Sequence, residues 1–259
     1  MAFGAIMGQT PLAETSPLDK IGLYQILGKG SGTWTPQQTG KYLVIVIGPG
    51  GDGGKGALSQ ASSIYAYGGA GGGSGGVAVF ELEVNELIEF SYEITDSSAI
   101  WNKQVTCNSG KPGQNGATVT PQPTLTILGG KGGTVDASIP LLLKANGLKG
   151  TDSNYTYSGL LDSFNVGASL PIVLNFPFFN QNKTGILLGS VTNGTPFQER
   201  NNSGVLTKQS VTPLGGLIGC GGDGGVGVWN AQYSGISVIV STPGKGGDGA
   251  IIIQYLGKD

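Results

Sequence analysis

The sequence predicts an all-β protein: a glycine-rich β-sandwich or jelly-roll in which extended glycine segments pack side by side in the manner of polyglycine II. Three observations support this fold class. Short apolar runs are bounded by glycine and proline, glycine recurs with a period of three, and no segment shows a convincing helical period. At 259 residues the chain is long enough for one large β domain or two smaller ones.

The clearest strand prediction is the run from Lys41 to Ile47. It is a continuous β-branched stretch that stops at Gly48, which is typical of a strand buried on both faces. Shorter candidate strands are Pro123 to Leu128, Ile236 to Val240 and Ala250 to Leu256.

Two further segments alternate between apolar and polar residues. Residues 80–84 and 88–94 place glutamate at every second position or close to it, namely at Glu81, Glu83, Glu89 and Glu93. This pattern predicts an antiparallel hairpin that turns near Asn85 and carries one charged, solvent-facing side. A pair of glycosidase carboxylates is the alternative interpretation of these glutamates.

Glycine accounts for 49 of the 259 residues and is concentrated in runs. The five runs are Gly48 to Gly56, Gly68 to Gly76, Gly129 to Gly133, Gly215 to Gly225 and Gly244 to Gly249. The first divides into triplets of two glycines and one guest residue, which is the period of a threefold, left-handed extended helix. Flexible linkers are the alternative, but these runs adjoin strands and carry charged guests. Packed rods without Cβ atoms could bond to one another through their backbones.

Composition excludes several classes of function. The net charge is −2 and Arg200 is the single arginine, so no nucleic-acid partner is expected. Histidine is absent, and Cys107 and Cys220 fit no metal spacing, so neither a cofactor nor a metal is expected; whether the two cysteines pair is open. No apolar run reaches the ~20 residues of a membrane helix, and the first residues lack the features of a signal peptide.

The order of strands and glycine runs resembles a known family. Residues 39–51 (TGKYLVIVIGPGG), 68–76 (GGAGGGSGG) and 246–255 (GGDGAIIIQY) resemble the glycine-rich domain of tailed-phage fibre and adhesin proteins, over roughly residues 33–256. The resemblance implies a virion tip protein without catalysis, made in the host cytoplasm and released by lysis. Its rods and strands would form a scaffold, and variable loops between them would grip a bacterial surface receptor.

The predicted domain organisation follows from this resemblance. Residues 1–32 are expected to form an N-terminal attachment arm and linker, and residues 33–259 the glycine-rich β domain, with 134–213 as an inserted variable segment. The arm would anchor the chain to a fibre shaft or baseplate protein; a disordered terminus is the alternative. The candidate attachment residues are Ile21, Leu23, Tyr24, Ile26 and Leu27.

Candidate receptor contacts are aromatic residues in the segments between the glycine runs, taken as 57–67, 95–117, 134–213 and 226–243. Aromatic faces near asparagine and glutamine suit a glycan or an outer-surface protein. Ordinary burial is the alternative, and it is favoured for Phe176, Phe178 and Phe179. The candidates are Tyr65, Tyr67, Trp101, Tyr155, Tyr157, Trp229 and Tyr233.

Other functions remain open at this point. The chain could be a structural virion part, such as a head fibre or baseplate component, or a tail-associated depolymerase; a homo-oligomer is possible. Residues 48–53 match the dinucleotide motif G-x-G-x-x-G, but a second glycine run stands where that fold requires an acidic residue. Cation binding by Asp52, Asp223 and Asp248 would require these residues to converge.

Overall fold

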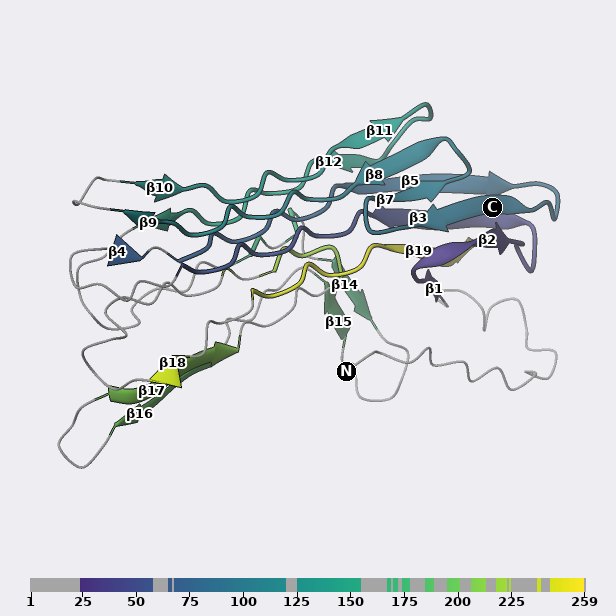
Figure 1. The fold of residues 1–259 in the computed structure, drawn as a ribbon. Helices are drawn as coiled ribbons and strands as arrows, with labels where there is room; N and C mark the ends of the chain where they lie inside the picture. Colours follow the sequence, from purple (N-terminus) through teal and green to yellow (C-terminus); the bar gives the residue numbers. More distant parts are fainter. Residues whose placement is uncertain are drawn as a thin grey trace.

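The computed structural model confirms an all-β fold (Figure 1). It describes residues 24–57, 65–66, 68–119, 125–154, 167–168, 170–171, 174–177, 185–188, 195–200, 206–212, 218–222, 224, 237–238 and 243–258. Within these ranges there is no helix, and all but one of the strand pairs are antiparallel.

Two five-stranded sheets face each other as a sandwich. The first sheet consists, in spatial order, of β1 (Tyr24–Leu27), β19 (Ala250–Gly257), β3 (Gly40–Ile47), β5 (Val77–Val84) and β12 (Leu143–Ala145). The second consists of β11 (Val135–Ala137), β8 (Val105–Asn108), β7 (Ser98–Trp101), β6 (Phe90–Ile94) and β2 (Gly30–Trp34). Strands from both ends of the chain therefore meet in one sheet.

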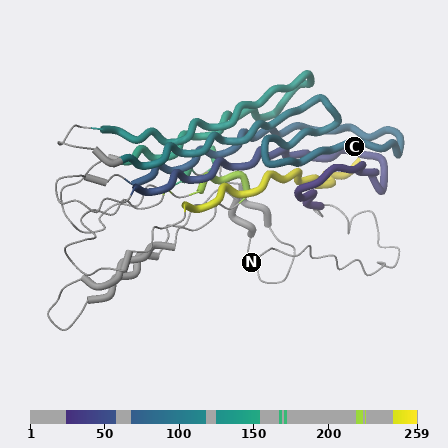
Figure 2. Tube along the Cα trace, viewed as in Figure 1, coloured from purple at the N-terminus to yellow at the C-terminus, as the bar shows by residue number. Residues whose placement is uncertain are grey.

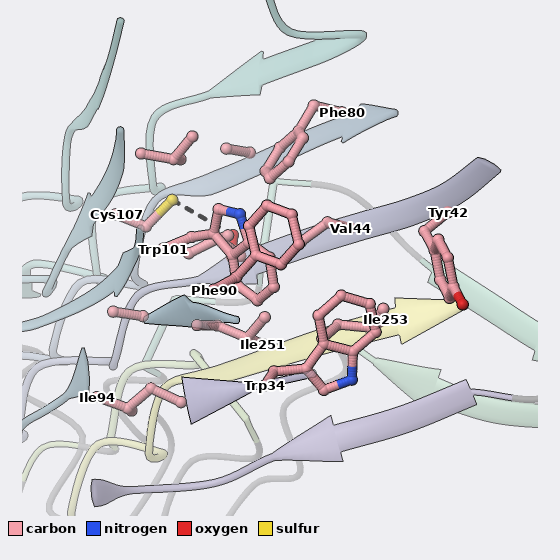
Figure 3. Packing of buried hydrophobic residues seen from close by; sticks show 14 of the residues in the cluster. Trp34, Tyr42, Val44, Phe80, Phe90, Ile94, Trp101, Cys107, Ile251 and Ile253 are labelled. Atoms are coloured by element: carbon pink, nitrogen blue, oxygen red, sulfur yellow. Dashed lines mark hydrogen bonds between the residues drawn. The ribbon is translucent and has the colours of Figure 1, made fainter. Parts of the chain in front are cut away.

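The core between the sheets is rich in aromatic residues (Figure 3). Trp101 is fully buried, and its ring stacks on Phe90 with the ring centroids 5.7 Å apart. Trp34 packs against the same cluster and donates from its indole Nε1 to Gln25 Oε1 at 2.6 Å, which ties β2 to β1. Offset and edge-on aromatic pairs of this kind add to the stability gained by burial.

The strand β3 is buried on both faces along its second half, as its sequence predicts. Val44 and Val46 face the second sheet, whereas Ile45 and Ile47 face a smaller cluster on the opposite side of the first sheet. Leu170 and Cys220 cover that opposite side. The alternation follows from the two-residue period of a strand, and it explains why residues 43–47 are all apolar.

The predicted hairpin of residues 80–94 is wrong. β5 belongs to the first sheet and pairs with β3 and β12, whereas β6 belongs to the second and pairs with β2 and β7. Residues 85–89 thus connect the two sheets instead of forming a turn within one. Period-two alternation correctly indicates that each strand has one wet face, but it does not identify the strand's partner.

The predicted boundary between arm and domain also differs from the structure. Residues 24–27 form β1, which pairs in register with β19, and residues 30–32 open β2, which pairs with β6. Residues 24–32 therefore belong to the sandwich instead of a linker. The rest of the predicted arm, residues 1–23, lies outside the described residues.

Smaller sheets account for the remaining strands. Residues 174–188 contribute β14 (Leu174–Pro177) and β15 (Gly185–Leu188), which pair with each other. A three-stranded sheet contains β16 (Thr195–Arg200), β17 (Leu206–Thr212) and β18 (Ser237–Val238), and β17 and β18 are parallel. These strands lie in the segments predicted to vary between fibre proteins.

Candidate functional site

Six strands of the sandwich continue directly into extended segments that run side by side away from it (Figures 1 and 2). We call these segments rods and the whole set the rod array. Six rods are residues 48–56, 68–76, 109–116, 129–134, 146–151 and 243–249, and residues 218–222 form a seventh among them, with the short piece 167–168 beside it. The first six adjoin β3, β5, β8, β11, β12 and β19, so the array is a continuation of the sandwich.

The rod 68–76 lies at the centre of the array. All seven N–H groups from Ala70 to Gly76 donate to main-chain carbonyls of other segments, over 2.8 to 3.2 Å. Residues of this rod that are three apart donate to the same neighbouring segment, so three neighbours supply the acceptors in turn. The acceptors are Gln114, Lys111 and Asn108 for Ala70, Gly73 and Gly76; Thr151 and Leu148 for Gly71 and Ser74; and Gly222 and Gly219 for Gly72 and Gly75.

The carbonyls of the same rod accept from three other neighbours. Rod 48–56 donates from Gly54, Gly51 and Gly48, rod 129–134 from Gly130 and Gly133, and the piece 167–168 from Ala168. The central rod is thus hydrogen-bonded to six surrounding segments. Because its period is three residues, each edge donates to one neighbour and accepts from another, which is the packing expected of threefold extended helices.

Glycine is required here by space, not by an unusual backbone dihedral. A Cβ built on Gly72 would lie 2.0 Å from the carbonyl oxygen of Gly51, and one on Gly50 would lie 1.8 Å from that of Cys220. Among the described glycines, only Gly30, Gly40, Gly219 and Gly257 have positive φ, and just Gly219 belongs to the array. A side chain at Gly50 or Gly72 would push two backbones apart.

The polar guest residues on the outer rods complete the hydrogen bonding. Asp52 Oδ1 accepts from the N–H of Gly246 at 2.8 Å, Asn115 Oδ1 from that of Lys55 at 2.8 Å, and Asn146 Oδ1 from that of Val135 at 3.2 Å. A backbone N–H on the border of the array has no further rod to bond, so a guest side chain takes that place. The guests therefore do more than face solvent.

Asp152 plays the same part and also forms an ion pair. Its Oδ1 accepts from the N–H of Gly129 at 2.7 Å, and its carboxylate pairs with Lys149 Nζ at 2.6 Å. The hydrogen bond from Lys149, followed by that from Gly129, lowers the pKa of Asp152 below its usual value. The carboxylate is therefore held in its charged form where the rods 129–134 and 146–151 meet.

The sequence prediction does not identify two of the rods. It places residues 109–116 in a loop segment and residues 146–151 in the variable insert, but both belong to the array. Their signal is glycine at every third position, Gly110, Gly113 and Gly116 in one and Gly147 and Gly150 in the other. One glycine per triplet is sufficient for an outer rod, because only one of its edges faces the interior.

At the end of the array opposite the sandwich, the chain leaves one rod and returns to another through a set of connections. Bonds that join Gly54 to Ala70, Gln114 to Leu128, Gly71 to Thr151 and Gly53 to Gly244 place the far ends of six rods level with one another. The described chain leaves this end at Ala57, Val119, Asn154 and Gly224, and it returns at Tyr65, Leu125, Gly167 and Pro243. Four connections therefore start and finish there.

Short strand pairs join neighbouring connections at this far end (Figure 1). β4 (Tyr65–Ala66) pairs with β9 (Thr118–Val119), and β10 (Thr126–Ile127) pairs with β13 (Ser153–Asn154). Ile127 is buried beside Ala70, with Leu125 and Ala117 packed against them. This small apolar cluster closes the far end of the array beneath the connections.

The structure places the predicted receptor residues unevenly. Tyr65 lies in β4 at the far end of the array. Trp101 is 0% exposed in the sandwich core, so the prediction of a receptor contact is wrong for it, and ordinary burial is the correct interpretation. Its segment, 95–117, contains β7, β8 and a rod instead of a loop. Tyr67, Tyr155, Tyr157, Trp229 and Tyr233 lie outside the described residues, as do Phe178 and Phe179.

The predicted attachment residues lie at the edge of the sandwich where they are described. Tyr24, Ile26 and Leu27 are part of β1, with Ile26 43% exposed and Leu27 packed against the main core. Ile21 and Leu23 lie outside the described residues.

No disulfide joins the two cysteines, and both are buried. Cys107 packs between the sheets and Cys220 packs on the opposite face of the first sheet. The Sγ of Cys107 donates to the carbonyl of Val46 at 3.3 Å, and burial raises the pKa of this thiol to about 12. Both thiols serve as small core residues.

No cluster of three or more potential metal ligands occurs among the described residues, and no helix in that part of the chain is long and apolar enough to cross a membrane. Comparison with models of known protein families found no family that matches the chain, and comparison with curated proteins found no relative.

Proposed function

We propose that this chain is the receptor-binding tip of a tailed-phage fibre, in which the connections at the far end of the rod array contact the bacterial surface. The partner would be a glycan or an outer-surface protein, and no catalytic step is involved. The protein would be made in the host cytoplasm and carried on the virion.

The observation that supports this proposal is the convergence of four connections at one end of a stiff support. At about 3.1 Å per residue, a nine-residue rod holds the connections about 28 Å from the sandwich. A rigid support reduces the entropy lost when variable loops bind a ligand. The connections also contain most of the aromatic residues predicted to bind, including Tyr65 and Trp229.

The glutamates of the predicted hairpin lie on the sandwich, away from the connections to which the proposal assigns binding. Glu81 and Glu83 lie on the first sheet, whereas Glu93 lies on the second, and all three are exposed on the sandwich surface.

Competition for adsorption tests the proposal. The purified chain should block adsorption of the phage to its host, and the combined variant Tyr65→Ala, Trp229→Ala and Tyr233→Ala should lose most of this effect. The matched control is Leu142→Ser, because Leu142 is 63% exposed beside β12, away from the far end. If the wild-type chain binds no host cells and blocks no adsorption, a structural virion role replaces the proposal.

A further inference from the structure

Two asparagine–glycine pairs lie on the border of the rod array, and each is held by the neighbouring rod. In the first pair, Asn115 Oδ1 accepts from the N–H of Lys55 at 2.8 Å, and the N–H of Gly116 donates to the carbonyl of Lys55 at 2.7 Å. One residue of the adjoining rod therefore binds both members of the pair. A third asparagine–glycine pair in the sequence, residues 193–194, lies outside the described residues.

The second pair repeats this arrangement where rod 129–134 continues into β11. Asn146 Oδ1 accepts from the N–H of Val135 at 3.2 Å, and the N–H of Gly147 donates to the carbonyl of Gly133 at 2.8 Å. In both pairs the asparagine is exposed and the glycine is half-buried. Water therefore reaches the side-chain amides, and hydrogen bonds restrain them more than burial does.

An asparagine–glycine pair reacts with itself when its backbone is free to move, because glycine has no side chain to shield its nitrogen. The glycine nitrogen loses its proton and forms a bond to Cγ of the asparagine, and the bond between Cγ and Nδ2 breaks. Nδ2 leaves as ammonia, which takes up the proton, and a cyclic succinimide remains. Water then opens the ring on either side of the glycine nitrogen and gives aspartate or isoaspartate. The net reaction consumes one water and releases one ammonia.

The array restrains both groups that must meet in the first step. The N–H of Gly116 points to the Lys55 carbonyl, so the proton is held in a hydrogen bond and the nitrogen is directed away from the side chain. The amide of Asn115 is anchored through Oδ1 to the same neighbouring residue, which fixes the position of Cγ. Both hydrogen bonds have to break before the nitrogen can reach Cγ, so the two rods must separate locally.

We propose that Asn115 and Asn146 are deamidation sites whose reaction is controlled by the adjoining rod. They stay intact while the rods are packed, and they react with water as the only reagent when the rods separate. The product is a covalent record that this border of the array has opened. The proposal concerns the array itself and does not depend on what the protein binds.

The two sites should react at different rates in the folded protein. Asn115 lies at the far end of the array, where the described chain ends soon afterwards at Val119. Asn146 directly follows β12 and lies beside the sandwich. Because the ends of ordered segments open more readily than segments next to a core, Asn115 should be converted faster than Asn146.

The test compares the full folded chain with the same chain denatured in guanidinium chloride, in one mildly alkaline buffer. Mass spectrometry of proteolytic peptides measures the conversion of each asparagine with time. Each site should deamidate at least about tenfold more slowly in the folded chain, because both hydrogen bonds must break first. Equal rates in the folded and denatured chains overturn the proposal. Faster conversion of Asn146 than of Asn115 in the folded chain contradicts the expected difference between the two sites.

Two substitutions separate the rods at one pair each. A Cβ on Gly54 would lie 1.9 Å from the carbonyl oxygen of Gln114, the residue before the first pair. A Cβ on Gly132 would lie 1.8 Å from the carbonyl oxygen of Gly147, within the second pair. Each variant is therefore the matched control for the other.

The expected result is a crossed pattern. Gly54→Ala should accelerate deamidation several-fold at Asn115 and leave Asn146 unchanged, and Gly132→Ala should do the reverse. Gly28→Ala should change neither rate, because its added Cβ has nothing within 4 Å. Acceleration of both sites by each variant, as general unfolding would produce, overturns control by the adjoining rod, and so does the absence of acceleration in both variants.

Discussion

The sandwich and the rod array are built from the same chain segments but are stabilised in different ways. The sandwich buries aromatic and β-branched side chains between two sheets, as at Phe80 and Trp101. The array has almost no side chains inside, and its interior consists of backbones joined by hydrogen bonds in three directions. The comparison shows that a chain with 49 glycines can have a second ordered interior that does not depend on hydrophobic burial.

The two regions should therefore respond to different substitutions. The sandwich depends on apolar area, at about 25 cal/mol per Å² buried. The array depends on close backbone approach, on hydrogen bonds that contribute about 0.5–1.5 kcal/mol each, and on weaker Cα–H···O contacts. Removing a large side chain should be the worst change in the sandwich, whereas adding a methyl group should be the worst in the array.

The largest effect is expected from Trp101→Ala. This side chain is fully buried and contacts the rings of Phe90, Phe80 and Trp34, so its removal should lower the free energy of unfolding by about 3–5 kcal/mol. Urea unfolding followed by circular dichroism measures the change. Leu142→Ala serves as the exposed control, with an expected change within about 0.5 kcal/mol. A loss below about 1 kcal/mol for Trp101→Ala would contradict the role of the aromatic cluster.

The next effect is expected from Gly72→Ala in the central rod. The added Cβ would lie 2.0 Å from the Gly51 oxygen and 2.6 Å from the Gly51 carbonyl carbon, so neighbouring rods must separate. We expect a loss of about 3 kcal/mol, at the upper end of the range for overpacking. Gly28→Ala is the matched control, because nothing lies within 4 Å of its added Cβ. Equal unfolding free energies for the two variants would show that the rods are not closely packed in solution.

A smaller effect is expected from Ser74→Ala. Ser74 is fully buried in the central rod, and its Oγ accepts from the N–H of Leu148 at 2.8 Å. Without the hydroxyl this N–H loses its acceptor, which should cost about 1–2 kcal/mol. Hydrogen exchange at the Leu148 amide should accelerate while exchange in β3 stays unchanged. The exposed residue Ser31 provides the control variant, Ser31→Ala, and equal effects of the two substitutions would rule out the predicted contribution.

The smallest effect is expected from Asp152→Asn, and it should depend on pH. The pKa of Asp152 is lowered in the folded state, chiefly by Lys149, so the charged carboxylate stabilises the fold above its unfolded pKa of about 3.9. This contribution is lost as the pH falls through the lower, folded pKa. Melting temperatures of wild type and variant should thus differ slightly near neutral pH and converge in acid. A difference that persists at about pH 2 would assign the effect to something other than this charge.

Much of the scaffold could be predicted because its signals are local. The run from Lys41 to Ile47 and the dense glycine runs each fix a backbone conformation within a few residues, and the strand and rods form where expected. The pairing of β5 and β6 could not be predicted, because alternation reports which side of a strand is wet and not which strand lies beside it.

The misplaced residues have a similar explanation. Trp101 is the last residue of β7 and lies outside the dense glycine runs, so the glycine pattern predicts a loop around it, although it is buried in the core. The sequence prediction does not identify the outer rods that contain Gly110 and Gly147. An outer rod needs only one glycine per triplet, and this is a weaker pattern than that of the dense runs. Which rods neighbour which depends on the whole array.

The position of β19 has a consequence for biosynthesis. This strand, from Ala250, lies between β1 and β3, and the rod before it bonds to Gly50 and Gly53 near the start of the array. Segments about 200 residues apart must therefore meet before β3 is covered on both edges. A nascent chain in which β19 has not yet been made lacks that partner, so assembly of this sheet has to wait for β19 and should be slow, as expected for topologies with distant contacts.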